Sequence, residues 1–128
     1  MLLGALVAMT PLALAARLSP DPTGLGTHQQ LGLPPCSSRL LWDMRCPACG
    51  MTTSWAHLVR GEVLESVRAN PGGMLLGLVA AGLSLVLSFS SVRGEVPRRR
   101  WAVALAWSLG AAMFLAVTDW GLRLALGT

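Results

Sequence analysis

The chain has 128 residues and a mass of 13.5 kDa, of which 53% are hydrophobic and 12% are charged. A soluble domain carries about 25% charged residues, and a chain this small has a large surface for its volume. The composition therefore excludes a soluble enzyme domain and a disordered chain. All ten basic residues are arginines, and the densest group borders an apolar stretch, so the pI near 10.2 does not indicate a nucleic-acid partner. These features predict a small membrane protein.

The first apolar stretch occupies residues 1–18 and carries no charge before Arg17. Its segment Ala13-Leu14-Ala15 resembles a signal-peptidase site, but no basic residue precedes the apolar run as a signal peptide requires. We therefore expect a slightly short first transmembrane helix, with Arg17 extending to the membrane interface. A cleaved, signal-like segment is the alternative.

Residues 19–50 are predicted to form a loop, since their first part is rich in Pro, Gly, Thr and Gln and shows no periodicity. Residues 51–69 are different, because Met51, Trp55, Leu58 and Val59 recur at helical spacing before Gly61 interrupts the pattern. Two short amphipathic helices fit this segment. They lie either at the membrane interface or with their apolar face packed on the membrane helices.

Two further stretches are long enough to cross a bilayer, whose hydrocarbon core of about 30 Å needs about 20 helical residues. The first is residues 72–92, which follow Asn70-Pro71, an N-cap residue and a proline suited to the first helical position. The second is residues 101–122, in which Trp101 and Trp120 stand where interfacial aromatic residues are expected. Near its end, Asp119 and Arg123 are spaced to pair across one turn.

The loop between these two spans contains four arginines, including the run Arg98–Arg100. Short basic loops determine orientation in the positive-inside rule, so we expect this loop to be cytoplasmic and the longer segment before residue 72 to face the exterior. Small residues at Gly73, Gly77 and Ala81 form a series that lets helices approach closely. This series indicates contact with another membrane protein, with a second copy, or with the last span of the same chain.

Three cysteines carry the chemistry of the chain. Cys36 stands alone, and Cys46 and Cys49 belong to a Cys-Pro-Ala-Cys-Gly element. Two cysteines at this spacing form either half of a metal site or a redox pair whose thiol pKa is lowered by a helix N-terminus.

A structural zinc site takes four ligands, so the three cysteines need a fourth. His57 follows Cys49 by about 12 Å of helix at about 1.5 Å per residue and lies too far away. His28 belongs to the loop and can fold back. The predicted metal ligands are therefore His28, Cys36, Cys46 and Cys49. The alternatives are a redox-active Cys46–Cys49 pair with Cys36 as exchange partner, or one purely structural disulfide.

These residues resemble the bacterial membrane family called domain of unknown function 2752. The resemblance spans roughly residues 20–90 and rests on an ordered run of motifs: Gly26-Thr-His28 to Pro-Pro-Cys36, then Cys46-Pro-Ala-Cys49-Gly-Met-Thr, Arg60-Gly61-Glu62 and Asn70-Pro71. It implies a small multi-span protein with a cysteine-bearing loop and a Cys-Pro-x-Cys-Gly element entering a helix, and it supplies no function. We expect the protein to lie in the bacterial inner membrane. Many relatives place an arginine where this chain has Thr53, so any role of that arginine does not transfer.

Taken together, the sequence predicts an all-α integral membrane protein with about three transmembrane helices, one or two short amphipathic helices and a cysteine-bearing loop. Residues 1–128 are expected to form a single membrane domain. The expected function is non-enzymatic: a zinc-stabilised exoplasmic loop in a subunit or accessory factor of a membrane complex. A membrane thiol–disulfide oxidoreductase and an assembly protein with a structural disulfide are the alternatives.

Overall fold

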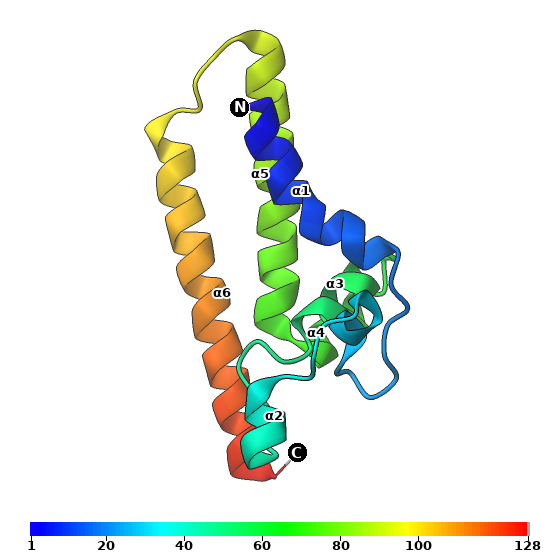
Figure 1. Cartoon of the computed structure of the whole chain (residues 1–128). Coiled ribbons are helices and arrows are strands. Elements are labelled where there is room, and N and C mark those ends of the chain that lie inside the picture. Colours follow the sequence, from blue (N-terminus) through cyan, green and yellow to red (C-terminus); the bar gives the residue numbers. More distant parts are fainter. Residues whose placement is uncertain (128) are drawn as a thin grey trace.

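The computed structural model describes residues 1–127, and every regular element in this range is a helix (Figure 1). In chain order the elements are α1 (Leu2–Ala16), the 3₁₀ helix η1 (Thr27–Leu31), α2 (Ser37–Trp42), α3 (Met51–Leu58), α4 (Val63–Ala69), α5 (Pro71–Arg93) and α6 (Arg99–Leu126). The all-helical expectation is confirmed for this part of the chain.

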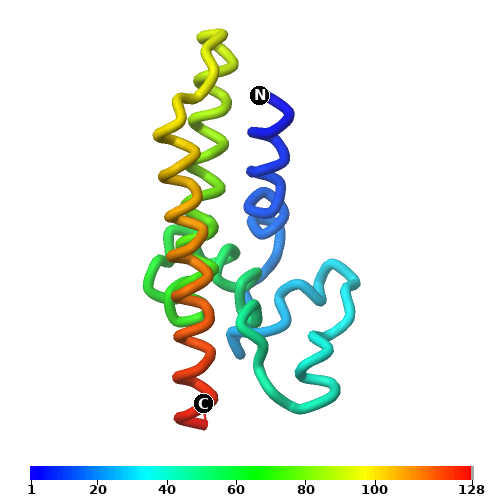
Figure 2. Tube along the Cα trace, turned by 90° about the vertical axis from the view of Figure 1, so that its left-hand side faces the viewer, coloured from blue at the N-terminus to red at the C-terminus, as the bar shows by residue number. Residues whose placement is uncertain are grey.

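Helix α5 is the centre of the fold, with α1 on one side and α6 on another (Figures 1 and 2). Gly72 allows the contact with α6, because a Cβ atom there would lie only 2.5 Å from the backbone oxygen of Ala112. On the α1 side, the hydroxyl of Ser84 donates a hydrogen bond of 2.9 Å to the backbone oxygen of Ala5. Both contacts depend on small residues, which bring helix backbones close together.

By length and composition, α5 and α6 are each able to cross a membrane. Their 23 and 28 residues correspond to roughly 34 and 42 Å at about 1.5 Å per residue. They match the spans expected at 72–92 and 101–122, although α6 starts earlier and ends later. The third expected span, α1, has 15 residues, or roughly 22 Å, and is shorter than a bilayer core.

The distribution of side chains is inverted relative to a soluble protein. The largest fully buried side chains are hydroxylic: Thr27, Thr53, Ser54 and Ser66. Large apolar side chains of the two long helices face outward instead, among them Trp107 and Phe114, which are 77% and 70% exposed. In lipid the apolar groups gain nothing from burial, whereas small residues and hydrogen bonds hold helices together. This distribution fits helices surrounded by lipid.

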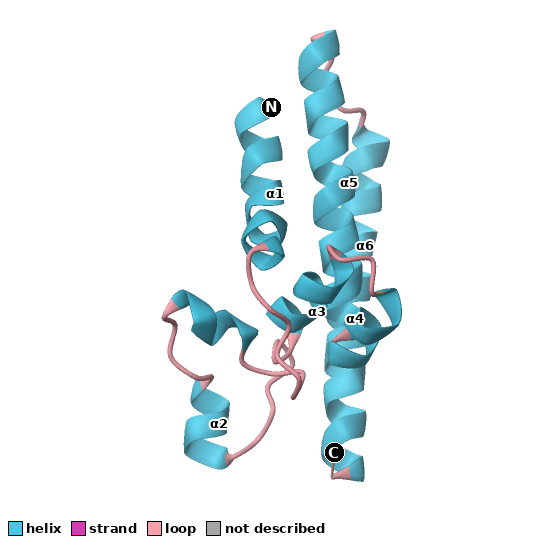
Figure 3. Cartoon of the chain, turned by 90° about the vertical axis from the view of Figure 1, so that its right-hand side faces the viewer, coloured by secondary structure: helices cyan, strands magenta, loops and turns pink. Residues whose placement is uncertain are grey.

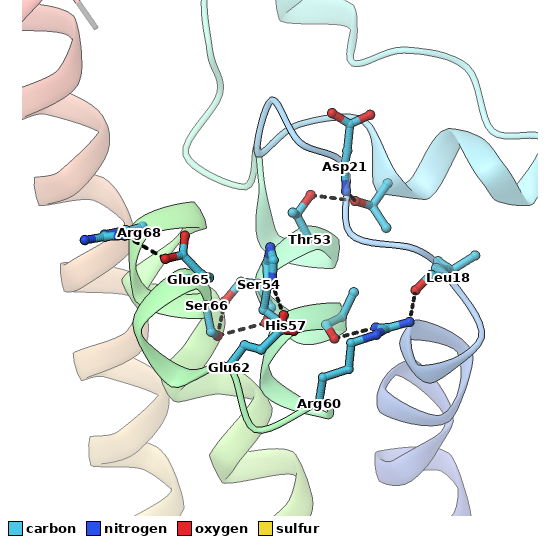
Figure 4. Close-up of polar contacts among 12 residues, drawn as sticks. Leu18, Asp21, Thr53, Ser54, His57, Arg60, Glu62, Glu65, Ser66 and Arg68 are labelled. Atoms are coloured by element: carbon cyan, nitrogen blue, oxygen red, sulfur yellow. Dashed lines mark hydrogen bonds and ion pairs between the residues drawn. The ribbon is translucent and has the colours of Figure 1, made fainter.

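Helices α3 and α4 form a hairpin at the start of α5 (Figure 1). Ser54 and Ser66 join the two helices through a hydroxyl–hydroxyl hydrogen bond of 2.9 Å, and Ser66 also donates to the backbone oxygen of Ser54 (Figure 4). Arg60 then ties the hairpin to the end of α1, because its guanidinium donates to the backbone oxygen of Leu18 at 2.6 Å. The hairpin therefore connects α1 with α5.

The small residues early in α5 receive α3. A Cβ atom on Gly77 would lie 2.7 Å from the side chain of Leu58 and 3.0 Å from that of Trp55. The Trp55 indole also donates to the backbone oxygen of Gly73 at 2.8 Å. The apolar face of α3 thus packs on α5, a candidate membrane helix, and this is one of the two arrangements expected. The three contacts considered for these small residues, with another membrane protein, a second copy or the last span, did not include this contact with α3.

The segment expected as a loop, 19–50, contains two short helices, η1 and α2. Each of these helices is only about one or two turns long, which is too short for a periodic pattern of apolar residues to predict a helix. Within the described residues α2 packs against no other helix, and it extends to one side of the molecule (Figure 3). Its Leu40, Leu41 and Trp42 side chains are all exposed.

Candidate metal centre

The fold brings the three cysteines together. The sulfur atoms of Cys36, Cys46 and Cys49 all lie within 4.8 Å of one another, and those of Cys46 and Cys49 are 2.8 Å apart. The first of these cysteines precedes α2, and the other two precede α3, so two separate segments supply the thiols.

The Cys46–Cys49 pair is held in a tight turn. The backbone N–H of Cys49 donates to the backbone oxygen of Cys46 at 2.9 Å, and the N–H of Cys46 donates to the Cys49 sulfur at 3.1 Å. Gly50 closes the turn with a φ of +83°, a conformation that favours glycine. A Cβ atom there would also lie 2.7 Å from the backbone oxygen of Ala69. The glycine after Cys49 is therefore required for two independent reasons.

The same turn is fastened to both long helices. Asn70, only 2% exposed, donates through its side-chain amide to the backbone oxygens of Pro47 and Cys49, at 3.0 and 3.2 Å. Its carbonyl oxygen accepts from the N–H of Gly73 at 2.7 Å and caps α5. From α6, the indole of Trp120 donates to the backbone oxygen of Arg45 at 2.6 Å. Two cysteines thus occupy a rigid platform, and the third arrives from the weakly packed segment of α2.

The thiols differ in acidity. The backbone N–H of Ser38, together with Cys46, lowers the pKa of the Cys36 thiol to about 7. Burial, reinforced by hydrogen bonds that the Cys46 thiol donates to Cys49 and Cys36, raises the pKa of the Cys46 thiol to about 12. A hydrogen-bond donor favours the thiolate and desolvation disfavours it. Of these two thiols, Cys36 therefore ionises first as the pH rises.

His28, the predicted fourth ligand, lies in η1 and lines the same cavity of about 290 Å³ as the three cysteines. Its ring nitrogens do not belong to the group of ligand atoms within 4.8 Å of one another. The position of η1 is set by a buried hydrogen bond of 2.8 Å between the hydroxyls of Thr27 and Thr53. The Thr27 hydroxyl also accepts from the backbone N–H of Asp21 (Figure 4). Thr53 thus positions the segment that carries His28.

Sequence reasoning missed several residues around the cysteines. Arg39 and Met51 line the cavity, and no carboxylate is among the described residues that line it. Arginine adds a positive charge beside the thiols, and a thioether is a soft group like the thiolates. The adjacency of Met51 to the Cys-Pro-Ala-Cys-Gly element was the available signal for that residue.

The other titratable residues singled out in the sequence lie elsewhere. His57 lies in α3 and pairs with Glu62, with Nδ1 and Oε2 2.5 Å apart (Figure 4). Asp119 and Arg123 form the expected ion pair across one turn of α6, at 2.7 Å.

Comparison with known proteins confirms the family resemblance. Residues 36–83 match the model of a family described as "Protein of unknown function (DUF2752)". The matched range includes all three cysteines, Asn70 and the first part of α5, whereas His28 and α6 lie outside it. No curated protein and no solved structure matches the chain.

Proposed function

We propose that Cys36, Cys46, Cys49 and His28 bind a zinc ion that holds together the exoplasmic segment of a small multi-pass protein of the bacterial inner membrane. The observation that carries this proposal is the meeting of three thiols from two segments within 4.8 Å. With Zn–S bonds of about 2.3 Å, two sulfurs on one tetrahedral zinc lie roughly 3.8 Å apart. The cysteines need shifts of only about 1 Å to reach that arrangement.

A metal ion would supply stability where this segment lacks a core. Helix α2 packs on no other helix among the described residues, so contacts of its own do not fix the segment that carries Cys36. Structural zinc contributes roughly 10–16 kcal/mol of apparent binding free energy in small peptides. The Cys46–Cys49 platform is already fastened to α5 and α6, so a bound ion would attach the α2 segment to the membrane helices.

In this proposal α1 is the third span, the Arg98–Arg100 loop is cytoplasmic, and the metal centre lies outside the cytoplasm. The exposed leucines and tryptophan of α2 would then be presented on that side at a fixed position. A protein of this kind serves as a subunit or accessory factor of a membrane complex, with the ion as a structural element.

A second candidate function is thiol–disulfide exchange, favoured by the 2.8 Å separation of the Cys46 and Cys49 sulfurs. In that reaction the two thiols form one S–S bond and lose two protons and two electrons. A disulfide of a substrate protein accepts the electrons and protons and becomes two thiols. The Cys36 thiol, with its lowered pKa, would attack the substrate disulfide, release one substrate thiol and form a mixed disulfide with the other. Cys49 would then displace the second substrate thiol from Cys36, and Cys46 would displace Cys36 to leave the Cys46–Cys49 disulfide.

Elemental analysis of the detergent-purified chain, with a free-thiol count on the same sample, tests the proposal. We expect about one zinc per chain and three thiols that react only after chelation. The variants C36S, C46S, C49S and H28A should each lose zinc, and H57A, whose ring pairs with Glu62, should retain it. A metal-free protein with one reactive thiol would overturn the metal proposal and favour exchange. Full zinc occupancy in H28A would remove His28 from the ligand set.

A further inference from the structure

A second cavity, of about 360 Å³, lies beside the metal centre and shares none of its lining residues. Three arginines line it, and each comes from a different segment: Arg45 precedes the cysteine turn, Arg68 belongs to α4, and Arg123 belongs to α6. Three guanidinium groups held close together repel one another, so an anion bound between them would stabilise the fold. The three arginines are far apart in the sequence, and only the tertiary structure brings them together.

The carboxylates at this cavity leave Arg45 without an ion pair among the described residues. Asp21 accepts hydrogen bonds from the backbone N–H and the hydroxyl of Thr23, and Glu65 pairs with Arg68 at 2.6 Å (Figure 4). Three arginines thus face two acidic residues among those that line the cavity.

The guanidinium groups are also partly fixed in place. Arg123 pairs through Nε with Asp119, which does not line the cavity, and donates through a terminal nitrogen to the backbone oxygen of Arg68 at 2.7 Å. The backbone of Arg45 is held by Trp120. Within residues 1–127 the side chain of Arg45 has no ion pair. Arginine's planar fork binds phosphate oxygens in pairs, and a fixed fork loses less entropy on binding.

The cavity lies beyond the apolar part of α5. Ala116 packs on Gly72, at the first turn of α5, and Arg123 lies about two turns further along α6. At about 1.5 Å per residue this is about 10 Å beyond the start of the apolar part of α5. The headgroup layer extends roughly 5–8 Å beyond the hydrocarbon core on each side, so the cavity lies at its outer edge, within reach of a lipid phosphate and of free phosphate.

We infer that this cavity is a binding site for a phosphate group, carried by an anionic phospholipid or present as free inorganic phosphate. The inference goes beyond the metal centre and does not depend on it. Arg45 and Arg68 contribute the accessible guanidinium groups, and Arg123 contributes charge and organises the backbone of α4.

The experiment uses the full chain purified in detergent. Native mass spectrometry measures the retention of dioleoyl phosphatidylglycerol against dioleoylglycerol, which has the same chains and no phosphate. Tryptophan fluorescence measures binding of inorganic phosphate. The indole of Trp120 is hydrogen-bonded to the backbone of Arg45, so a ligand at Arg45 should change its emission. We expect retention of the phospholipid over the phosphate-free lipid, and about tenfold weaker binding in R45Q and in R68Q.

The matched control is R17Q, which removes one positive charge at the end of α1, outside the cavity. It should bind as the unmodified chain does. Helical circular dichroism and thermal unfolding in detergent identify any variant that fails to fold, and the exposed Arg68 makes R68Q the safer of the two substitutions. Loss in R45Q and R68Q with the phospholipid assigns a lipid headgroup, and the same loss with inorganic phosphate alone assigns a free anion. Binding of neither probe, or equal weakening by R17Q, would overturn the inference.

Discussion

Replacing Asn70 should separate the stability of α5 from the metal affinity of the proposed zinc site, because this one side chain contributes to both. Its carbonyl oxygen caps α5 by accepting from Gly73, and its amide group donates to Pro47 and Cys49 in the cysteine turn. Removing an N-cap costs about 0.5–2 kcal/mol. Each amide hydrogen bond contributes about 0.5–1.5 kcal/mol net, so the two donors together contribute roughly 1–3 kcal/mol.

Two variants separate these contributions. In N70A both are lost, whereas N70S retains a good capping residue and lacks the two donors. We expect N70A to lower both the unfolding temperature and the zinc affinity. N70S should lower the zinc affinity by about tenfold, which corresponds to roughly 1.4 kcal/mol, and it should recover most of the unfolding temperature.

The measurements are competition with a chromophoric chelator for zinc affinity and thermal unfolding in detergent for stability. S108A is a suitable control, because that exposed hydroxyl bonds only within its own helix. If N70S binds zinc as tightly as the unmodified chain, the amide bonds of Asn70 do not position the cysteine turn, and our account of the platform is wrong.

Two further predictions concern the cysteine turn. G50A should destabilise the chain by at least about 1–2 kcal/mol, since the new Cβ would collide with the backbone of Ala69 and the residue has a left-handed backbone conformation. The control G82A, whose Cβ would meet open space, should leave the unfolding temperature nearly unchanged. Equal effects of the two substitutions would contradict this explanation. In the reduced, metal-free chain, alkylation should modify Cys36 first, with a rate that rises through about pH 7 as its thiolate forms, while Cys46 reacts only in strong alkali. Peptide mapping across a pH series checks the order, and uniform labelling of both cysteines at pH 7 would refute it.

Local features of this chain were predictable because local spacing determines them. Uninterrupted apolar residues indicated the helices α5 and α6, and Asn70-Pro71 indicated where α5 begins. A spacing of four residues placed Asp119 beside Arg123. In each case the interacting groups lie within a turn or two along the chain, so helix geometry alone brings them together.

Contacts between residues that are far apart in the sequence were determined only by the tertiary structure. It placed Cys36 beside the Cys46–Cys49 pair, and it gave Asn70 a second role at the cysteine turn. It also packed α3 against the small residue Gly77 of α5. Each of these contacts joins residues separated by loops, and residue identity does not specify how a loop closes. The sequence by itself therefore determined a helical chain with two helices able to span a membrane and with a cysteine motif. Only the tertiary packing of α3, of the segment that carries η1 and Cys36, and of the two long helices decided which residues surround that motif.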